Sequence, residues 1–241
     1  MNYEIGANKI RALVILPTYN EKENIEKLIK EILAQNLSLD ILVVDDNSPD
    51  GTGQLVEGLR KNIPQLFILH REKKEGLGWA YISGFKWALE KGYDYIFQMD
   101  ADLSHQPKYL PLLWEKLKEN DFVIGSRYIK GGGIVGWPWY RLFLSCFASL
   151  YASTILGTRI KDFTGGFNGF RKEVLKKIAF DKIISQGYAF LLEFKYKVVR
   201  NGFKVAEVPI IFIERRNGKS KISKRIIWEA IINCWKLRFG L

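Results

Sequence analysis

Three polar segments in the first half of the chain follow apolar runs and carry residues that could bind a metal ion or a phosphate. They are Pro17-Thr18-Tyr19-Asn20-Glu21, Asp45-Asp46-Asn47-Ser48-Pro49-Asp50-Gly51 and Asp100-Ala101-Asp102. Ligands of open parallel sheets bind beyond the carboxyl ends of the strands, where such segments would meet. Asp, Asn and Ser are also ordinary turn and cap residues, which explains one segment more easily than three that converge.

The Asp100-Ala101-Asp102 triplet follows the buried run YIFQM and predicts a metal site. Hard divalent cations such as Mg²⁺ or Mn²⁺ take oxygen ligands and are shared between protein carboxylates and phosphate oxygens. A diphosphate is repelled by carboxylates unless such a cation lies between them. The triplet therefore predicts a Mg²⁺- or Mn²⁺-dependent diphosphate site, in which one carboxylate binds the metal and the other faces ribose or sugar.

Other nucleotide-binding signatures fit the chain poorly. The sequence has no GxxxxGK[ST] loop, and Gly76-Leu77-Gly78 lacks the later Gly or Ala of the dinucleotide fingerprint because Tyr81 stands there. His70 and His105 have no metal-ligand spacing, and we interpret both as structural or incidental.

Strands and helices alternate along the part of the chain that must position these segments. Apolar, β-branched runs predict strands at 10–16, 39–46, 66–70, 93–102 and 121–127. Helical spacing of apolar residues predicts helices at 21–34, 76–92 and 107–119. This order predicts an α/β fold with a mostly parallel sheet and helices on both faces.

After a Gly-rich loop at 128–138, an amphipathic helix is expected at about 138–157. One side would carry the polar stripe of Arg141, Ser145, Ser149 and Ser153, and other sides would carry Phe143, Phe147, Leu150 and Tyr151. The seventeen uncharged residues between Arg141 and Arg159 are fewer than the ~20 of a membrane span. The pattern suits a helix in a protein groove or on a membrane surface.

A second amphipathic helix is expected at 223–240. Ile227, Ile231, Cys234 and Trp235 would share one side, with Lys224, Arg225, Lys236 and Arg238 nearby. Basic residues beside Trp and Ile suit an anionic membrane interface. Packing on the domain core explains the same pattern equally well.

The composition of the chain limits the kinds of partner that the protein could bind. A chain of 241 residues with 47% hydrophobic content can bury a substantial core. Its net charge of +11 favours polyanionic partners, namely nucleic acid, acidic lipid headgroups or phosphorylated small molecules, although a soluble protein can simply be basic. Acidic segments at three strand ends would repel nucleic acid, so we expect no nucleic-acid partner.

The two cysteines and the start of the chain bear on localisation. Cys146 and Cys234 fit no disulfide or zinc pattern, which favours a reducing compartment. We expect neither a signal peptide nor a transmembrane span. The expected location is the cytoplasmic face of a membrane, with peripheral attachment.

Seven motifs resemble the signature series of the inverting family-2 glycosyltransferases. They are PTYNE (17–21), VVDDNSPDGT (43–52), GLGWAY (76–81), MDADLSHQP (99–107), GSRY (125–128), DFTGGFNGFR (162–171) and ERRNGKSK (214–221). Within the family they most resemble the polyprenol-phosphate (dolichyl-phosphate) mannose synthases, in a form without C-terminal membrane spans. The resemblance implies a Rossmann-like GT-A catalytic domain at 1–220, with a donor half at about 8–128 and an acceptor half at about 129–220. The C-terminal amphipathic basic helix would occupy 221–241.

The resemblance also implies roles for individual residues. The base and ribose of a nucleotide sugar would be surrounded by Pro17, Tyr19, Glu21, Val44 and Asp46. The diphosphate would face Asp100, Ala101 and Asp102, with Asp102 the preferred metal ligand and Asp100 the second candidate. Ser104 stands where family members often have Gln, and a hydroxyl is a weaker and shorter ligand. Arg215 and Lys221 would grip the donor diphosphate, and the acceptor phosphate would be bound by Arg127, Arg141 and Ser145. The catalytic set implied is Asp102, Arg127, Arg215 and Lys221.

The implied reaction transfers mannose from GDP-mannose to a polyprenyl phosphate with inversion, giving a β-linked product and GDP. A phosphate monoester, whose second pKa is about 6, is largely dianionic at neutral pH and needs no general base. The alternatives are another donor such as UDP-glucose, or a sugar-hydroxyl acceptor, for which Asp162 or Glu193 could supply the required base. A non-enzymatic basic module that binds membranes or nucleic acid would explain the charge but not the acidic segments.

Overall fold

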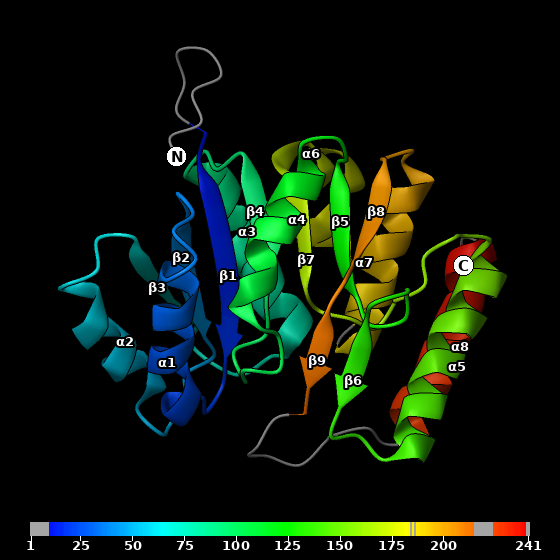
Figure 1. The fold of residues 1–241 in the computed structure, drawn as a ribbon, viewed down its shortest axis with the longest axis horizontal. Coiled ribbons are helices and arrows are strands. Elements are labelled where there is room, and N and C mark those ends of the chain that lie inside the picture. Colours follow the sequence, from blue (N-terminus) through cyan, green and yellow to red (C-terminus); the bar gives the residue numbers. More distant parts are fainter. Residues whose placement is uncertain (1–9, 184, 186, 215–223, 240–241) are drawn as a thin grey trace.

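A seven-stranded sheet forms the centre of the molecule in the computed structural model, which describes residues 10–183, 185, 187–214 and 224–239 (Figure 1). In spatial order the strands are β3 (Leu66–His70), β2 (Asp40–Asp45), β1 (Ala12–Thr18), β4 (Tyr95–Gln98), β7 (Asn168–Arg171), β5 (Phe122–Ser126) and β8 (Val205–Pro209). Neighbouring strands are parallel except that β7 runs antiparallel to both β4 and β5.

The register of the central strands brings the polar segments together. Thr18 at the end of β1 pairs with Asp45 at the end of β2. Ile15 in β1 pairs with Gln98, the last residue of β4. Because these strands are parallel, the segments that follow them leave the sheet at the same edge.

Helices cover both faces of the sheet, as the alternation of elements predicted. Apolar side chains of α1 (Lys22–Leu33), α2 (Thr52–Arg60) and α4 (Leu110–Leu117) form one core cluster with the sheet. The second cluster contains side chains of α3 (Leu77–Glu90), α6 (Lys172–Ile178) and α7 (Tyr188–Arg200). The short 3₁₀ helix η1 (Pro107–Tyr109) leads into α4, and a second one, η2 (Phe180–Lys182), follows α6.

Two further elements, α5 (Trp139–Leu156) and α8 (Lys224–Phe239), lie side by side at the β8 end of the molecule (Figure 1). The Trp235 indole donates a 2.7 Å hydrogen bond to the Tyr151 hydroxyl. Cys234 is buried in the same core cluster as α3 and α7. Both amphipathic helices are therefore present, and α8 packs on the protein.

The two faces of α5 have opposite surroundings. Ser149, from the polar stripe, is only 1% exposed, whereas Phe143, Phe147 and Leu150 are 63%, 57% and 65% exposed. The polar stripe thus faces the protein and the apolar side faces outward. Among the described helices, none has the length and apolar character required to cross a bilayer.

Several predicted boundaries were wrong. The fourth strand ends at Gln98 and not at 102, so the Asp100-Ala101-Asp102 triplet lies in a loop. The segment expected as a loop at 128–138 contains β6 (Gly133–Val135), which pairs in parallel with β9 (Ile211–Ile213). The helix α2 was not predicted. The antiparallel β7 was missed because its sequence, NGFR, is short and begins with two poor strand formers.

Candidate active site

The loops after β1 and β2 are joined by hydrogen bonds between side chains and backbone. The Thr18 hydroxyl donates to Asp45 Oδ1 at 3.1 Å, and the Asn20 N–H donates to Ser48 Oγ at 3.0 Å. Asp50 Oδ2 accepts from the Lys22 N–H at 3.1 Å. Turn and cap chemistry therefore accounts for Asp45 and Asp50, whose carboxylates are used to hold the loops.

Asp46 and Tyr19, both expected at the base and ribose, face basic side chains at this edge. Asp46 forms a 2.5 Å ion pair with Arg71, and both side chains are nearly buried. Burial raises the pKa of Asp46, an effect that Arg71 reduces but does not cancel. The Lys74 ammonium lies 3.6 Å from the centre of the Tyr19 ring. Arg71 also pairs with Glu75 at 2.6 Å, so its guanidinium group lies between two carboxylates.

The remaining residues expected at the base contribute differently. Pro17 is partly exposed, and Glu21 hydrogen-bonds Asn24 at 2.8 Å while its N–H donates to Thr52 Oγ1. Val44 is fully buried in the core. Its side chain packs in the core cluster that includes α3, and its contact with the base stays a prediction.

The Asp100-Ala101-Asp102 loop is held by a hydrogen bond to His105. Nδ1 of His105 accepts the Asp100 N–H at 3.2 Å, and the imidazole stacks on Phe167. Burial lowers the pKa of His105, which keeps the ring neutral and its Nδ1 able to accept. His105 is thus structural and orients the first aspartate of the triplet.

The two carboxylates of the triplet lie in different surroundings. Asp102 Oδ1 accepts the Ser104 N–H at 3.1 Å, which closes a local turn. Asp100 Oδ1 accepts a 3.4 Å hydrogen bond from the buried Tyr81 hydroxyl. Burial raises the pKa of Asp100, and the charge of Asp102 raises it further. A cation between the two carboxylates would relieve this repulsion.

These donors fit a hard divalent cation. Asp100 and Asp102 supply carboxylate oxygens, and the buried Ser104 hydroxyl has no hydrogen-bond partner among the described residues. The described part of the chain contains no group of three His, Cys, Asp or Glu side chains placed to hold a metal. Mg²⁺ is commonly bound by one or two carboxylates together with substrate phosphates and water. The triplet suits that mode and not a closed protein cage.

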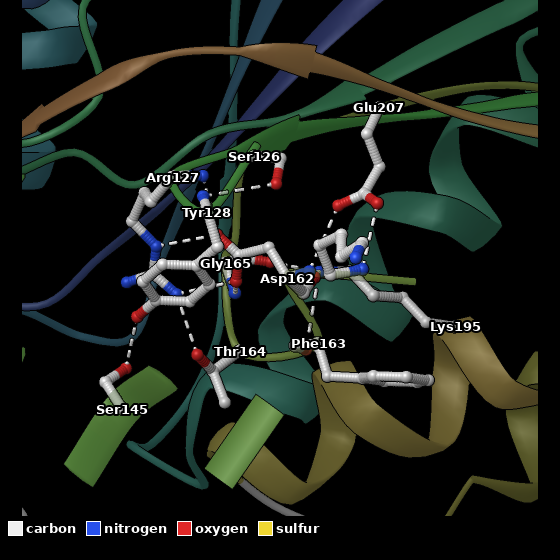
Figure 2. Close-up of polar contacts among 11 residues, drawn as sticks. Ser126, Arg127, Tyr128, Ser145, Asp162, Phe163, Thr164, Gly165, Lys195 and Glu207 are labelled. Atoms are coloured by element: carbon white, nitrogen blue, oxygen red, sulfur yellow. Dashed lines mark hydrogen bonds and ion pairs between the residues drawn. The ribbon is translucent and has the colours of Figure 1, made fainter. Parts of the chain in front are cut away.

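Arg127 and Asp162 form a buried ion pair (Figure 2). The Arg127 Nε and Nη2 groups each donate a 2.7 Å hydrogen bond to Asp162, and Nη2 also donates to Thr164 Oγ1 at 2.7 Å. The Arg127 backbone N–H and the Gly165 N–H complete the shell of the carboxylate. Arg127, expected at the acceptor phosphate, thus has one edge committed to Asp162.

Lys195 holds the loop at 162–166 from the side opposite Arg127 (Figure 2). Its ammonium group is fully buried and donates hydrogen bonds to the carbonyls of Asp162, Phe163 and Gly165, at 2.8, 3.3 and 2.7 Å. Burial lowers the pKa of Lys195 to about 8. The loop at 162–166 is therefore held by two buried cations.

Neither carboxylate considered as a general base is available in this arrangement. Asp162 is 0% exposed, and although burial opposes the effect, the Arg127 charge holds its pKa well below its usual range. Glu193 is 6% exposed, accepts a 2.6 Å hydrogen bond from Ser185 and pairs with Lys197. Asp162 and Glu193 thus serve the protein's own structure.

Two of the three expected acceptor residues, Arg127 and Arg141, lie near Trp137. The guanidinium carbons of Arg127 and Arg141 lie 5.8 and 4.0 Å from the centre of its rings. Arg141 also forms a 2.6 Å ion pair with Glu214. Ser145, one helical turn from Arg141, accepts a 2.7 Å hydrogen bond from the Tyr128 hydroxyl. Two cations and two hydroxyl groups thus lie at the first turns of α5.

Arg215 and Lys221, expected at the donor diphosphate, lie outside the described residues. The structure adds four residues that sequence reasoning missed, namely Arg71, Trp137, Lys195 and Glu214. Glu214 begins the basic motif at 214–221, which was a usable signal. Lys195 had none, because a lysine in an amphipathic helix normally faces solvent.

A mostly parallel sheet with helices on both faces and an Asp-x-Asp loop at its carboxyl edge is the arrangement of the GT-A fold class. The chain belongs to glycosyl transferase family 2, whose family model matches residues 13–179. It is therefore a glycosyltransferase.

Two curated relatives match almost the whole chain. The undecaprenyl-phosphate mannosyltransferase of Micrococcus luteus is 44% identical over 96% of this chain and 95% of its own. The polyprenol monophosphomannose synthase of Mycolicibacterium smegmatis is 44% identical over 95% of this chain and 88% of its own.

Solved structures share the fold at lower identity. Glucosyl-3-phosphoglycerate synthase from Mycobacterium tuberculosis, in complex with Mn²⁺, UDP and glucosyl-3-phosphoglycerate, is 18% identical with a TM-score of 0.66, over 96% of this chain and 81% of that one. The mannosyltransferase PcManGT from Pyrobaculum calidifontis, in complex with GDP-Man and Mn²⁺, is 18% identical with a TM-score of 0.59, over 94% and 69%.

Proposed function

We propose that this glycosyltransferase transfers mannose from GDP-mannose to a polyprenyl phosphate, with inversion at the anomeric carbon. The names of the two relatives that match nearly the full chain describe polyprenyl-phosphate mannosyl transfer. The observation in the structure that most favours a phosphate acceptor is the state of Asp162, which is fully buried and bound by Arg127. A hydroxyl acceptor needs a carboxylate base, whereas a phosphate dianion does not.

The site needs separate groups of residues for the donor and the acceptor, because both substrates carry negatively charged phosphate groups. Two phosphate groups must approach one another, so the enzyme has to align them and offset their repulsion. Arg127 and Arg141 beside Trp137 would bind the acceptor together with Ser145. Arg215 and Lys221 would bind the donor diphosphate, and Asp46 and Tyr19 would lie at the nucleoside.

Asp102 and Asp100 would hold a Mg²⁺ or Mn²⁺ ion, with Ser104 as an additional oxygen donor. When bound, the cation would neutralise charge that develops on the departing nucleoside diphosphate. The support for this assignment is the pair of mutually repelling carboxylates and the Ser104 hydroxyl, which has no partner in the part of the chain that the structure describes.

Peripheral attachment to a membrane fits the outer side of α5. Its exposed apolar side chains, Phe143, Phe147 and Leu150, also line a groove of about 680 Å³ together with Tyr128, Cys146 and Ile160. Tyr128 contacts Ser145, so the groove begins beside the expected phosphate site. The rest of the lining is polar, namely Ser153, Thr158, Arg159 and Lys161. The apolar part suits the isoprenoid chain of the acceptor.

The test is a product analysis with purified protein, Mg²⁺ or Mn²⁺, GDP-mannose and undecaprenyl phosphate in detergent. We expect GDP release that requires both the metal and the lipid phosphate, and a β-linked mannosyl lipid in the NMR spectrum. Undecaprenol, which has a hydroxyl in place of the phosphate, should not react. Turnover with undecaprenol or a free sugar as acceptor would refute the phosphate assignment, and turnover with UDP-glucose alone would refute the donor.

A further inference from the structure

The Glu214 carboxylate forms an ion pair with the guanidinium group of Arg141. Arg141 Nη1 and Glu214 Oε1 are 2.6 Å apart, and the two side chains are 18% and 34% exposed. A carboxylate is a planar oxyanion and a phosphate is a tetrahedral one. Arginine binds either of them through the same N–H donors. Glu214 therefore stands where the phosphate of the proposed acceptor would bind Arg141.

Two N–H groups beside this ion pair have no acceptor among the described residues. They are Arg141 Nε–H and Trp137 Nε1–H, and both nitrogen atoms are buried. A buried donor without a partner costs about 1–3 kcal/mol, and native proteins contain few of them. The guanidinium of Arg141 lies against the Trp137 rings, at 4.0 Å from their centre. The cluster therefore has more donors than the single Glu214 carboxylate uses.

The backbone of Glu214 is fixed independently of its side chain. Its N–H donates a 2.9 Å hydrogen bond to the carbonyl of Val135, which continues the pairing of β6 with β9. Gly136, with a φ of +93°, lies against the Cβ of Glu214, where a larger residue would crowd it. The carboxylate can thus turn away from Arg141 by side-chain rotation while the strand pairing is kept.

We propose that Glu214 is an internal substitute for the phosphate of the acceptor, and that Trp137 is a further phosphate-binding residue of this site. This inference rests on the proposed function, because it takes Arg141 as an acceptor-phosphate residue. The terminal oxygens of a phosphate monoester accept from both edges of Arg141 and from the Trp137 indole, so the phosphate satisfies donors that Glu214 leaves unused. Glu214 competes with every oxyanion for Arg141, and it favours a dianion that can displace it.

The test compares the wild-type protein with Glu214→Gln and Trp137→Phe. Binding of farnesyl phosphate, and of inorganic phosphate in a second arm, is measured by isothermal titration calorimetry without vesicles. Glu214→Gln should bind farnesyl phosphate roughly 10-fold more tightly, because it removes the competing charge. Trp137→Phe should bind it roughly 10-fold more weakly, because it removes one hydrogen bond to a charged group. Inorganic phosphate should respond in the same directions and bind more weakly than the ester.

Matched controls separate these effects from general ones. Trp139→Phe alters an exposed indole two residues away, and Glu115→Gln removes a carboxylate from a surface ion pair with Lys118. Neither control should change the affinity. Glu214→Ala serves as the second variant if Glu214→Gln melts more than a few degrees below wild type.

Unchanged or weaker binding by both Glu214 variants would overturn the inference, since a purely structural brace would give that result. The inference would also be overturned if the substitutions changed the affinity for inorganic phosphate but left the affinity for farnesyl phosphate unchanged. The readout does not require transfer. A wild-type protein that binds farnesyl phosphate but transfers no mannose would refute the proposed function and leave this comparison decisive.

Discussion

A Cβ atom added to Gly166 would lie 3.0 Å from Oδ1 of Asp100. Glycine at this position therefore lets the loop at 162–166 close directly onto the first carboxylate of the Asp-x-Asp triplet. The same loop carries Asp162, the partner of Arg127. One short loop thus contacts both the Asp100 carboxylate, expected at the donor, and Arg127, expected at the acceptor.

Gly166→Ala should displace the Asp100 carboxylate while the protein remains folded. Misplacement of a reacting group by about 1 Å can cost roughly 100-fold in rate, so we expect kcat to fall about 10- to 100-fold. Steady-state assays with varied Mn²⁺ would measure this loss. Gly58→Ala is the control, because its Cβ meets nothing within 4 Å in α2; it should keep full activity. Equal kcat for Gly166→Ala and wild type would show that the contact is incidental.

Asp102→Asn should remove metal-dependent turnover. Loss of one charged ligand weakens the site for the cation and for the diphosphate, and we expect a decrease in kcat/KM of about 100-fold or more. The measurement is GDP release as a function of Mg²⁺ or Mn²⁺ concentration. Asp181→Asn, on the exposed η2 turn, is the matched control. Retention of wild-type metal dependence by Asp102→Asn would exclude Asp102 as a ligand.

Asp162→Asn should destabilise the fold and is not a clean test for a general base. Removing one partner of a buried ion pair costs about 3–5 kcal/mol. The Arg127 charge outweighs burial and lowers the pKa of Asp162. This contribution to stability is therefore present above the unfolded pKa of about 3.9 and is lost as the pH falls through the lower folded value. Urea unfolding should give a large difference from wild type at pH 7 and a smaller one in acid.

Lys195→Met should reveal the cost of burying an ammonium group. Burial lowers the pKa of Lys195 to about 8, below its unfolded value of about 10.4. Between these values the unfolded state binds the additional proton, so the free energy of unfolding of the wild type rises with pH. Relative to Lys195→Met, it should rise by about 2 kcal/mol from pH 7.5 to 9.5. A constant difference between the two proteins would contradict the lowered pKa.

Phe147→Asp combined with Leu150→Asp should weaken binding to lipid vesicles. Each large apolar side chain contributes about 1.5–3 kcal/mol when it leaves water, and the new carboxylates are repelled by anionic lipid. We expect at least a 10-fold loss of affinity for anionic vesicles in a co-sedimentation assay. Leu112→Asp introduces one carboxylate, half the added charge of the double variant, at an exposed position of α4 and should bind like wild type.

Much of the fold could be predicted because it depends on local pattern. Apolar runs such as Ala12–Leu16 are almost fully buried in β1, and helical spacing located α1, α3 and α4. The antiparallel β7 and the β6–β9 pair could not be predicted in this way. Their strands have three or four residues, and their pairing depends on partners far away in the sequence, which no local periodicity records.

The sequence by itself determined the α/β order and, through its ordered motifs, membership of the family-2 glycosyltransferases, and it singled out Asp100-Ala101-Asp102 as the motif expected to bind a metal. Only the tertiary structure decided what each charged residue does. It bound Asp162 to Arg127, buried Lys195 under three carbonyls and placed Glu214 on Arg141. The reason is physical: the charge and geometry of a side chain are fixed by its type, but its desolvation and its partners are set by the residues that the fold brings within a few ångströms.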